Sequence, residues 1–286
     1  MAPLPERILR RKTPPARRRW ALVLGGGAAR GIAHVGVMRV LEREGLSPDQ
    51  IVGTSAGALA GVFMAAGVSA DRAAAWGESL RWPLLARPIV SRLGLMSNER
   101  MGELLRRALP VATFDELVIP FACMATDLAT AEPVILCEGE LISAVRASCA
   151  IPGLFVPVER DGLLLVDGGV TANVPTAVAR LFGVDIVVAV DVNLSYRRPQ
   201  PPRNMIEIVT HSFYTAGRAA AQLAANNADV LIAPDIGDIG FDQLGRAKEL
   251  IAAGEAAARQ ALPRLRALLE ADPAAGRATV AAGEAV

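Results

Sequence analysis

Cysteine and histidine are scarce in this 286-residue chain. The three cysteines, Cys123, Cys137 and Cys149, show no metal-ligand spacing and no Cys-x-x-Cys pair, so we interpret them as small buried thiols rather than as a disulfide framework. The two histidines, His34 and His211, leave few candidates for an imidazole base. Neither a calcium-binding loop nor a zinc-site pattern is present, so we expect no metal and no cofactor.

The chain also lacks a hydrophobic run long enough to cross a bilayer. The longest apolar run, residues 56–70, is too short to span and is predicted to form a buried helix. The apolar run at residues 20–24 ends in three glycines, which argues against a secretion signal. We therefore expect a cytoplasmic protein.

A net charge of only +1 offers no whole-molecule case for nucleic-acid binding. The positive charge is concentrated in residues 1–19, which hold seven basic residues, one acidic residue and four prolines. This composition predicts a disordered basic tail. The alternative is that the tail docks peripherally on an anionic membrane.

Hydrophobic residues make up 52% of the chain but aromatic residues only 4%, which is typical of helix-covered parallel sheets built from small aliphatic side chains. Alternating strand and helix patterns predict one α/β domain over residues 20–272, followed by a frayed Ala- and Gly-rich end at 273–286. Residues 81–96 are predicted to be a connection. Strands are expected at 20–25, 50–53, 121–125, 134–137, 163–166, 185–190 and 230–233, and helices at about 31–44, 56–70, 140–148, 204–227 and 242–269.

The run Gly53-Thr54-Ser55-Ala56-Gly57 has the spacing of a nucleophile elbow. An apolar strand leads into it and an apolar helix leads out, so the chain must turn abruptly at the serine. Gly53 and Gly57 leave room for that turn. The backbone N–H groups at the start of the helix, from Ala56 onward, would face negative charge developing beside Ser55. The alternative is an ordinary Gly-rich turn.

A second glycine-rich loop, Gly25 to Gly31, lies between the first strand and the first helix and could bind an anion. A dinucleotide site is disfavoured because the loop reads Gly-x-Ala-x-x-Gly and the second strand lacks the acidic residue that would hold a ribose. No Gly-Lys-Ser/Thr is present for a nucleoside triphosphate. Arg30 could hold a phosphate, brace the loop or lie on the surface.

A serine nucleophile needs a base, and the attractive candidate is Asp167, which ends an apolar strand and precedes Gly168 and Gly169. A poorly hydrated site there would favour a carboxylate able to accept a proton. A triad of Ser55, Asp167 and His211 can be drawn, but too few strands precede Ser55 for an α/β-hydrolase fold. Three further acids that follow strands are interpreted as structural: Asp127, Asp191 and Asp235.

These residues together resemble the patatin-like phospholipases and acylhydrolases in their compact bacterial form. Four motifs occur in that family's order over about residues 20–192: Gly25-Gly26-Gly27 with Arg30-Gly31, then the run 53–57, then residues 147–153 with Phe155, and finally Asp167-Gly168-Gly169 with Asn173 and Pro175. The resemblance implies a three-layer α/β sandwich with a mostly parallel central sheet.

By the same resemblance, Ser55 is the nucleophile and Asp167 its partner in a Ser-Asp dyad. Gly26 and Gly27 would supply oxyanion N–H groups, and Arg30 would be the nearby basic residue. Ala28 departs from the family, where many members have glycine, and its methyl group could narrow the loop.

The sequence therefore predicts a serine acylhydrolase that cleaves fatty-acyl esters of phospholipids or lysophospholipids through an acyl-enzyme. Residues 150–158 could line an acyl chain. The alternatives are a thioesterase or acyltransferase with the same dyad and a non-catalytic lipid-binding protein.

Overall fold

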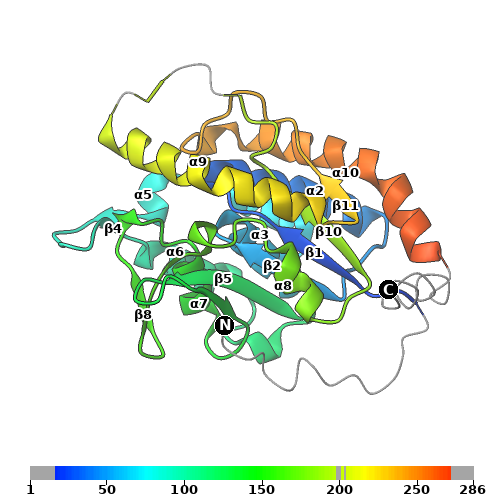
Figure 1. Ribbon diagram of the computed structural model, residues 1–286, viewed down its shortest axis with the longest axis horizontal. Coiled ribbons are helices and arrows are strands. Elements are labelled where there is room, and N and C mark those ends of the chain that lie inside the picture. Colours follow the sequence, from blue (N-terminus) through cyan, green and yellow to red (C-terminus); the bar gives the residue numbers. More distant parts are fainter. Residues whose placement is uncertain (1–16, 198–200, 203, 272–286) are drawn as a thin grey trace, which may run out of the picture.

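An eight-stranded sheet forms the centre of the computed structural model, which describes residues 17–197, 201–202 and 204–271 (Figure 1). The strand order is β11-β10-β1-β2-β5-β9-β8, with β6 also paired to β5. Strands β11, β10, β1, β2 and β5 are parallel, whereas β6, β8 and β9 run antiparallel to their neighbours. The strands are β1 (Trp20–Leu24), β2 (Gln50–Thr54), β5 (Phe121–Asp127), β6 (Pro133–Leu136), β8 (Val158–Arg160), β9 (Leu163–Asp167), β10 (Ile186–Val190) and β11 (Val230–Ile232).

Helices cover both faces of this sheet (Figure 1). The α-helices are α2 (Ala33–Arg43), α3 (Ala56–Ala65), α4 (Ala70–Ser79), α5 (Trp82–Leu85), α6 (Glu99–Ala108), α7 (Leu141–Ser148), α8 (Thr176–Leu181), α9 (Met205–Asn226) and α10 (Ala247–Glu270). Short 3-10 helices are η1 (Ala28–Ile32), η2 (Phe114–Glu116), η3 (Gly168–Val170) and η4 (Leu244–Arg246).

The alternation of side chains along β1 explains the three layers. Trp20, Leu22 and Leu24 point into the larger core, which they share with α2, α3, α7 and α10. Ala21 and Val23 point into a second core, which is closed by residues of α8 and α9. Because both faces are buried, the parallel strands are continuously apolar, and the predicted three-layer sandwich is confirmed.

Two segments differ from the sequence-based expectation. Arg17, Arg18 and Arg19, assigned to the basic tail, are held on the domain by bonds to Asp49, to the Leu268 carbonyl and, through the Arg19 N–H, to Asp185. The predicted connection at 81–96 contains α5 and two strands of a small second sheet, β3 (Arg87–Pro88) and β4 (Gly94–Ser97), which is completed by β7 (Gly153–Phe155). Short, exposed strands of this kind carry little periodicity for a sequence pattern to detect.

Residues 1–16 and 272–286 lie outside the described part of the chain, and with them most of the predicted tail and the predicted frayed end. Among the described helices, none combines the length and the apolar character that crossing a membrane requires.

Candidate active site

Ser55 stands at the turn between β2 and α3, with backbone angles φ 53° and ψ −121°. A non-glycine residue in this region is strained, and such strain is characteristic of the sharp turn that exposes a nucleophile. The flanking glycines are required by close approach. A Cβ on Gly57 would lie 2.0 Å from the Leu24 carbonyl oxygen, and one on Gly53 would lie 2.6 Å from the Ala58 Cα. Strand, turn and helix therefore lie where the sequence places them.

A buried serine of α7 anchors this turn. The Ser55 N–H donates to the Ser148 hydroxyl oxygen at 2.9 Å, and the Ser148 side chain is fully buried. This bond satisfies a backbone group that the tight turn removes from the strand ladder. Sequence reasoning placed Ser148 in a motif but gave it no role, because its partner is 93 residues away along the chain.

Asp167 ends β9, the strand that runs antiparallel to β5, and only 1% of its surface is exposed. The Gly169 N–H donates to its Oδ1 at 2.7 Å. Burial raises the pKa of the Asp167 carboxyl to about 7, and its hydrogen bonds to Ser55 and Gly169 oppose that rise. A carboxylate with this pKa is a stronger proton acceptor than one in water.

The Ser55 side chain forms a hydrogen bond with the Asp167 carboxylate. The structure thus joins the two residues that the sequence selected, although 112 positions separate them. Ser55 also forms a hydrogen bond with the Cys149 thiol, whose pKa is raised well above its ordinary value by burial. Cys149 therefore remains a neutral thiol at this site, and its place beside the serine was not predicted.

The glycine-rich loop passes close to the serine. A Cβ on Gly26 would lie 3.1 Å from the Ser55 Cβ, and one on Gly31 would lie 2.3 Å from the Ala56 Cβ. Ala28 takes a positive φ of 49°, a conformation that glycine adopts without strain. Gly168, in the Asp167 loop, packs against the Met124 carbonyl, where a Cβ would approach to 2.4 Å.

The loop's N–H groups differ in availability. The Gly26 N–H donates to the Asn173 carbonyl at 3.2 Å, so this donor is engaged in the structure. Within the described residues, no hydrogen bond uses the N–H of Gly27 or Ala28. Ala56, the first residue of α3, places another N–H at the positive end of that helix.

His34 is fully buried and supports the same loop. Its Nε2 lies 2.7 Å from the Gly25 carbonyl oxygen, which makes Nε2 the donor, and burial lowers the pKa of the ring to about 4. A neutral imidazole tied to the backbone is a packing residue rather than a base, as the sequence favoured. His211 lies on α9 and lines a different cavity from Ser55.

An apolar cavity opens beside Ser55. With the solvent at its mouth it has a volume of ≈ 780 Å³, which is within the range of small-molecule sites. Cys149, Ile151 and Phe155 line it, so part of the predicted apolar segment 150–158 faces this space. Further lining residues include Ile32, Leu59, Ala60, Phe63, Trp76 and Met101. Such a wall excludes water and accommodates a hydrocarbon chain.

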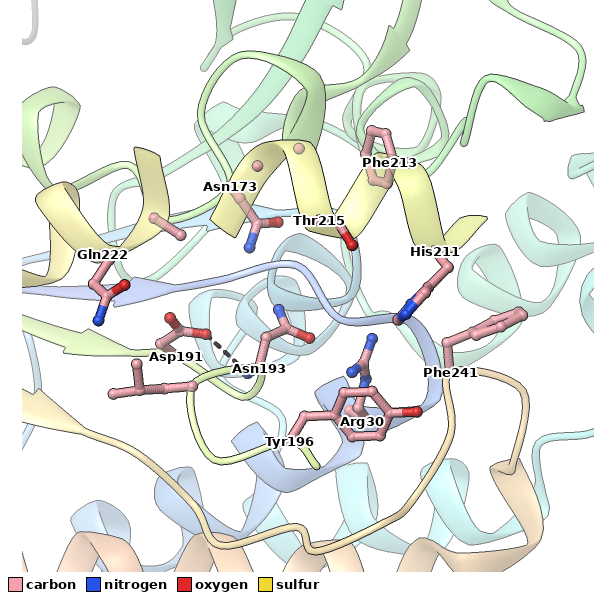
Figure 2. Close-up of a pocket in the computed structure, with 14 residues that line it drawn as sticks. Arg30, Asn173, Asp191, Asn193, Tyr196, His211, Phe213, Thr215, Gln222 and Phe241 are labelled. Atoms are coloured by element: carbon pink, nitrogen blue, oxygen red, sulfur yellow. Dashed lines mark hydrogen bonds between the residues drawn. The ribbon is translucent and has the colours of Figure 1, made fainter. Parts of the chain in front are cut away.

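Arg30 does not line the apolar cavity. Its side chain points into a second, polar cavity on the other side of the glycine-rich loop, where its guanidinium carbon lies 4.4 Å from the centre of the Tyr196 ring (Figure 2). Gly169 lines the same cavity. In the part of the chain that the structure describes, no group of three or more His, Cys, Asp or Glu side chains is placed to hold a metal ion.

Comparisons with known proteins agree with this arrangement. A family profile described as patatin-like phospholipase matches residues 22–180. The NTE family protein Mb1092c of Mycobacterium bovis is 38% identical over 184 residues, which are 63% of this chain and 51% of that protein. Patatin-like phospholipase domain-containing protein 6 of Homo sapiens is 34% identical over 183 residues, which are 60% of this chain and 13% of that protein.

The chain spans about half the length of the mycobacterial relative. Among solved structures, VipD from Legionella pneumophila aligns with a TM-score of 0.52 and 13% identity, covering 87% of this chain and 67% of that one. At this identity the likeness concerns the fold alone.

The raised pKa of Asp167 predicts a pH-dependent contribution to stability. Between about pH 4 and pH 7 the folded chain retains a proton on Asp167 that the unfolded chain has released, so this group's contribution to the free energy of unfolding falls as the pH rises. We expect the difference between wild type and Asp167→Asn to change by about 2 kcal/mol from pH 5 to pH 7, measured by urea unfolding. The titration of His34 is common to both proteins and cancels. A difference independent of pH would contradict the assignment.

Proposed function

Since the chain belongs to the patatin-like phospholipase family, we propose that it is a serine acylhydrolase that cleaves fatty-acyl esters of phospholipids or lysophospholipids. Ser55 is the nucleophile and Asp167 is the base. The observation that carries the proposal is the buried hydrogen bond between these two side chains at the edge of an apolar cavity.

The proton can be followed through both halves of the reaction. Asp167 accepts the hydroxyl proton of Ser55 as Oγ attacks the ester carbonyl, and the protonated acid then gives that proton to the departing alcohol oxygen. This leaves an acyl group on Ser55. Water attacks the acyl-enzyme, Asp167 accepts its proton, and the proton returns to Oγ as the fatty acid leaves. A pKa of about 7 suits a group that must both accept and return a proton near neutral pH.

The negative charge on the carbonyl oxygen needs donors fixed in advance, and one such donor contributes about 2.7–4 kcal/mol. We assign this role first to the N–H of Gly27, which has no acceptor among the described residues, and to the N–H of Ala56 at the start of α3. Gly26 could contribute only if its bond to Asn173 exchanges for the oxyanion. Arg30 then acts from behind the loop, where its Nε donates to the Gly27 carbonyl at 3.3 Å.

Removal of either dyad residue tests the mechanism. We expect Ser55→Ala and Asp167→Asn to abolish labelling by a fluorophosphonate probe and to lower fatty-acid release from mixed phospholipids about a thousandfold or more. Ser212→Ala and Asp235→Asn are matched controls on exposed positions and should label and hydrolyse like wild type.

Other outcomes of that experiment select the alternatives. Recovery of the acyl group on an added alcohol or thiol, in place of free acid, would make the protein an acyltransferase. Folded wild type that neither labels nor releases acid would leave a lipid-binding role.

The apolar cavity should set the acyl-chain length. Ala60 lines the cavity and is 7% exposed, so Ala60→Phe fills space that a long chain would occupy. We expect kcat/KM for a sixteen-carbon ester to fall at least about tenfold relative to a four-carbon ester, since each excluded CH₂ forfeits about 0.8 kcal/mol of transfer free energy. Ala252→Phe, on the exposed face of α10, is the control. An unchanged chain-length profile would place the acyl group elsewhere.

We further propose that residues 1–16 make peripheral contact with anionic membranes. Arg7, Arg10, Arg11 and Lys12 provide four positive charges against the single charge of Glu6, and each basic residue near such a surface contributes about 1 kcal/mol. Deletion of residues 1–16 should weaken sedimentation with anionic vesicles at low salt more than tenfold, and high salt should remove the difference. Equal binding of both proteins at low salt would refute the contact.

A further inference from the structure

A polar cavity lies behind the glycine-rich loop, between that loop, the segment after β10 and helix α9 (Figure 2). With the solvent at its mouth its volume is ≈ 800 Å³. The close-up shows Arg30 and Tyr196 below, Asn193 and Asp191 beside them, and His211 and Thr215 reaching in from α9 (Figure 2). None of these groups enters the acyl-transfer steps proposed above.

One short 3-10 helix separates the two cavities. Ala28, Ala29 and Gly31 of η1 line the apolar cavity, whereas Arg30 lines the polar one. Ser55 lies on the apolar side, and Gly169, two residues after Asp167, lies on the polar side. The dyad therefore stands between a space suited to hydrocarbon and a space suited to polar groups. An ester has both parts, one on each side of its scissile bond.

Arg30 provides the positive charge of the polar cavity. Its side chain is 2% exposed, and it is held in place by the Gly27 carbonyl and the face of Tyr196. A buried guanidinium that is already oriented loses little freedom on binding, and its planar donors match phosphate oxygens. The cavity therefore holds a prepared donor for an anion.

Asn193 provides an unused acceptor. Its Nδ2 donates to the Gly26 carbonyl at 2.6 Å, which fixes the amide orientation, and its buried Oδ1 has no hydrogen-bond partner within the described residues. A buried acceptor without a partner costs free energy that a ligand hydroxyl would recover. Asn173 also donates to the Gly26 carbonyl, at 3.5 Å, so this wall of the cavity is the back of the glycine-rich loop.

Asp191 places a negative charge farther along the same cavity, where its Oδ1 accepts the Asn193 N–H at 2.8 Å. This carboxylate disfavours an anion at its own end of the cavity. A phosphate would therefore lie at the Arg30 end, below His211 and Thr215 (Figure 2). The ligand that fits these groups carries a phosphate and a nearby hydroxyl.

We propose that this cavity binds the phosphorylated glycerol part of the substrate, which is the leaving group of the reaction. Arg30 contacts the phosphate, and Asn193 Oδ1 accepts a glycerol hydroxyl. This assignment rests on the proposed acylhydrolase function, and it makes the polar cavity the determinant of head-group selectivity.

Two soluble esters with the same medium-length acyl chain, one on glycerol 3-phosphate and one on glycerol, test the assignment. We expect wild type to favour the phosphorylated ester in kcat/KM by about ten- to a hundredfold, because hydrogen bonds to charged groups are the strong ones. Arg30→Gln should lower this ratio about tenfold or more, and Arg30→Lys should restore part of it. Arg107→Gln, on the exposed face of α6, should leave the ratio unchanged.

A second pair of variants avoids the glycine-rich loop, which Arg30 supports. Thr215 lines the cavity from an exposed position on α9. Thr215→Asp adds a negative charge and should lower the phosphate preference several-fold, whereas the nearly isosteric Thr215→Asn should not. Equal effects of Asp and Asn would contradict an electrostatic role for this cavity.

Titration calorimetry on Ser55→Ala separates a head group from a free anion. We expect glycerol 3-phosphate to bind more tightly than inorganic phosphate or glycerol, in a manner that Arg30→Gln weakens. Binding of inorganic phosphate equal to that of glycerol 3-phosphate, without ester selectivity, would identify a free-anion site and overturn the proposal. Hydrolysis of both esters at equal kcat/KM would overturn the leaving-group site and retain the acylhydrolase. Arg30-dependent binding without hydrolysis of either ester would overturn the acylhydrolase and retain the phosphate site.

Discussion

The close packing of backbone at the carboxyl ends of β1 and β2 is the constraint on which the rest of the site depends. Gly57 lies against the Leu24 carbonyl so closely that no side chain fits there, and this contact lets α3 begin one residue after Ser55. The strained backbone of Ser55 persists because the surrounding core and the Ser148 bond hold it. A looser junction would relax the turn and turn the hydroxyl away from Asp167.

Burial then sets the chemistry of the acid. Asp167 lies under η3 at the end of an antiparallel strand, where the carboxylate keeps hydrogen bonds from Gly169 and Ser55 but loses most of its hydration. The same desolvation that raises its pKa disfavours its charged form, so the basicity of the site comes at a cost in stability above neutral pH. Proteins commonly concentrate such destabilising features at functional sites.

The glycine-rich loop serves both cavities at once. Its backbone lies beside Ser55, its Arg30 side chain faces the polar cavity, and the Asn193 and Asn173 amides hold its Gly26 carbonyl from that side. A group bound in the polar cavity would therefore stiffen the same loop that faces the developing charge. Acyl chain, reacting carbonyl and leaving group would be arranged along one line through the dyad.

The sequence by itself determined the local features: the elbow at Ser55, the acid after the strand ending at Asp167, and the alternating strands and helices that predict the three layers. These depend on neighbours within a few residues, which a pattern can register. Only the tertiary structure decided that Ser148 anchors the elbow, that Cys149 contacts Ser55, that the Gly26 N–H is already engaged, and that Asp191 shares a cavity with Arg30. Those contacts join positions from about 40 to 160 residues apart, where chain packing rather than local propensity sets the distance.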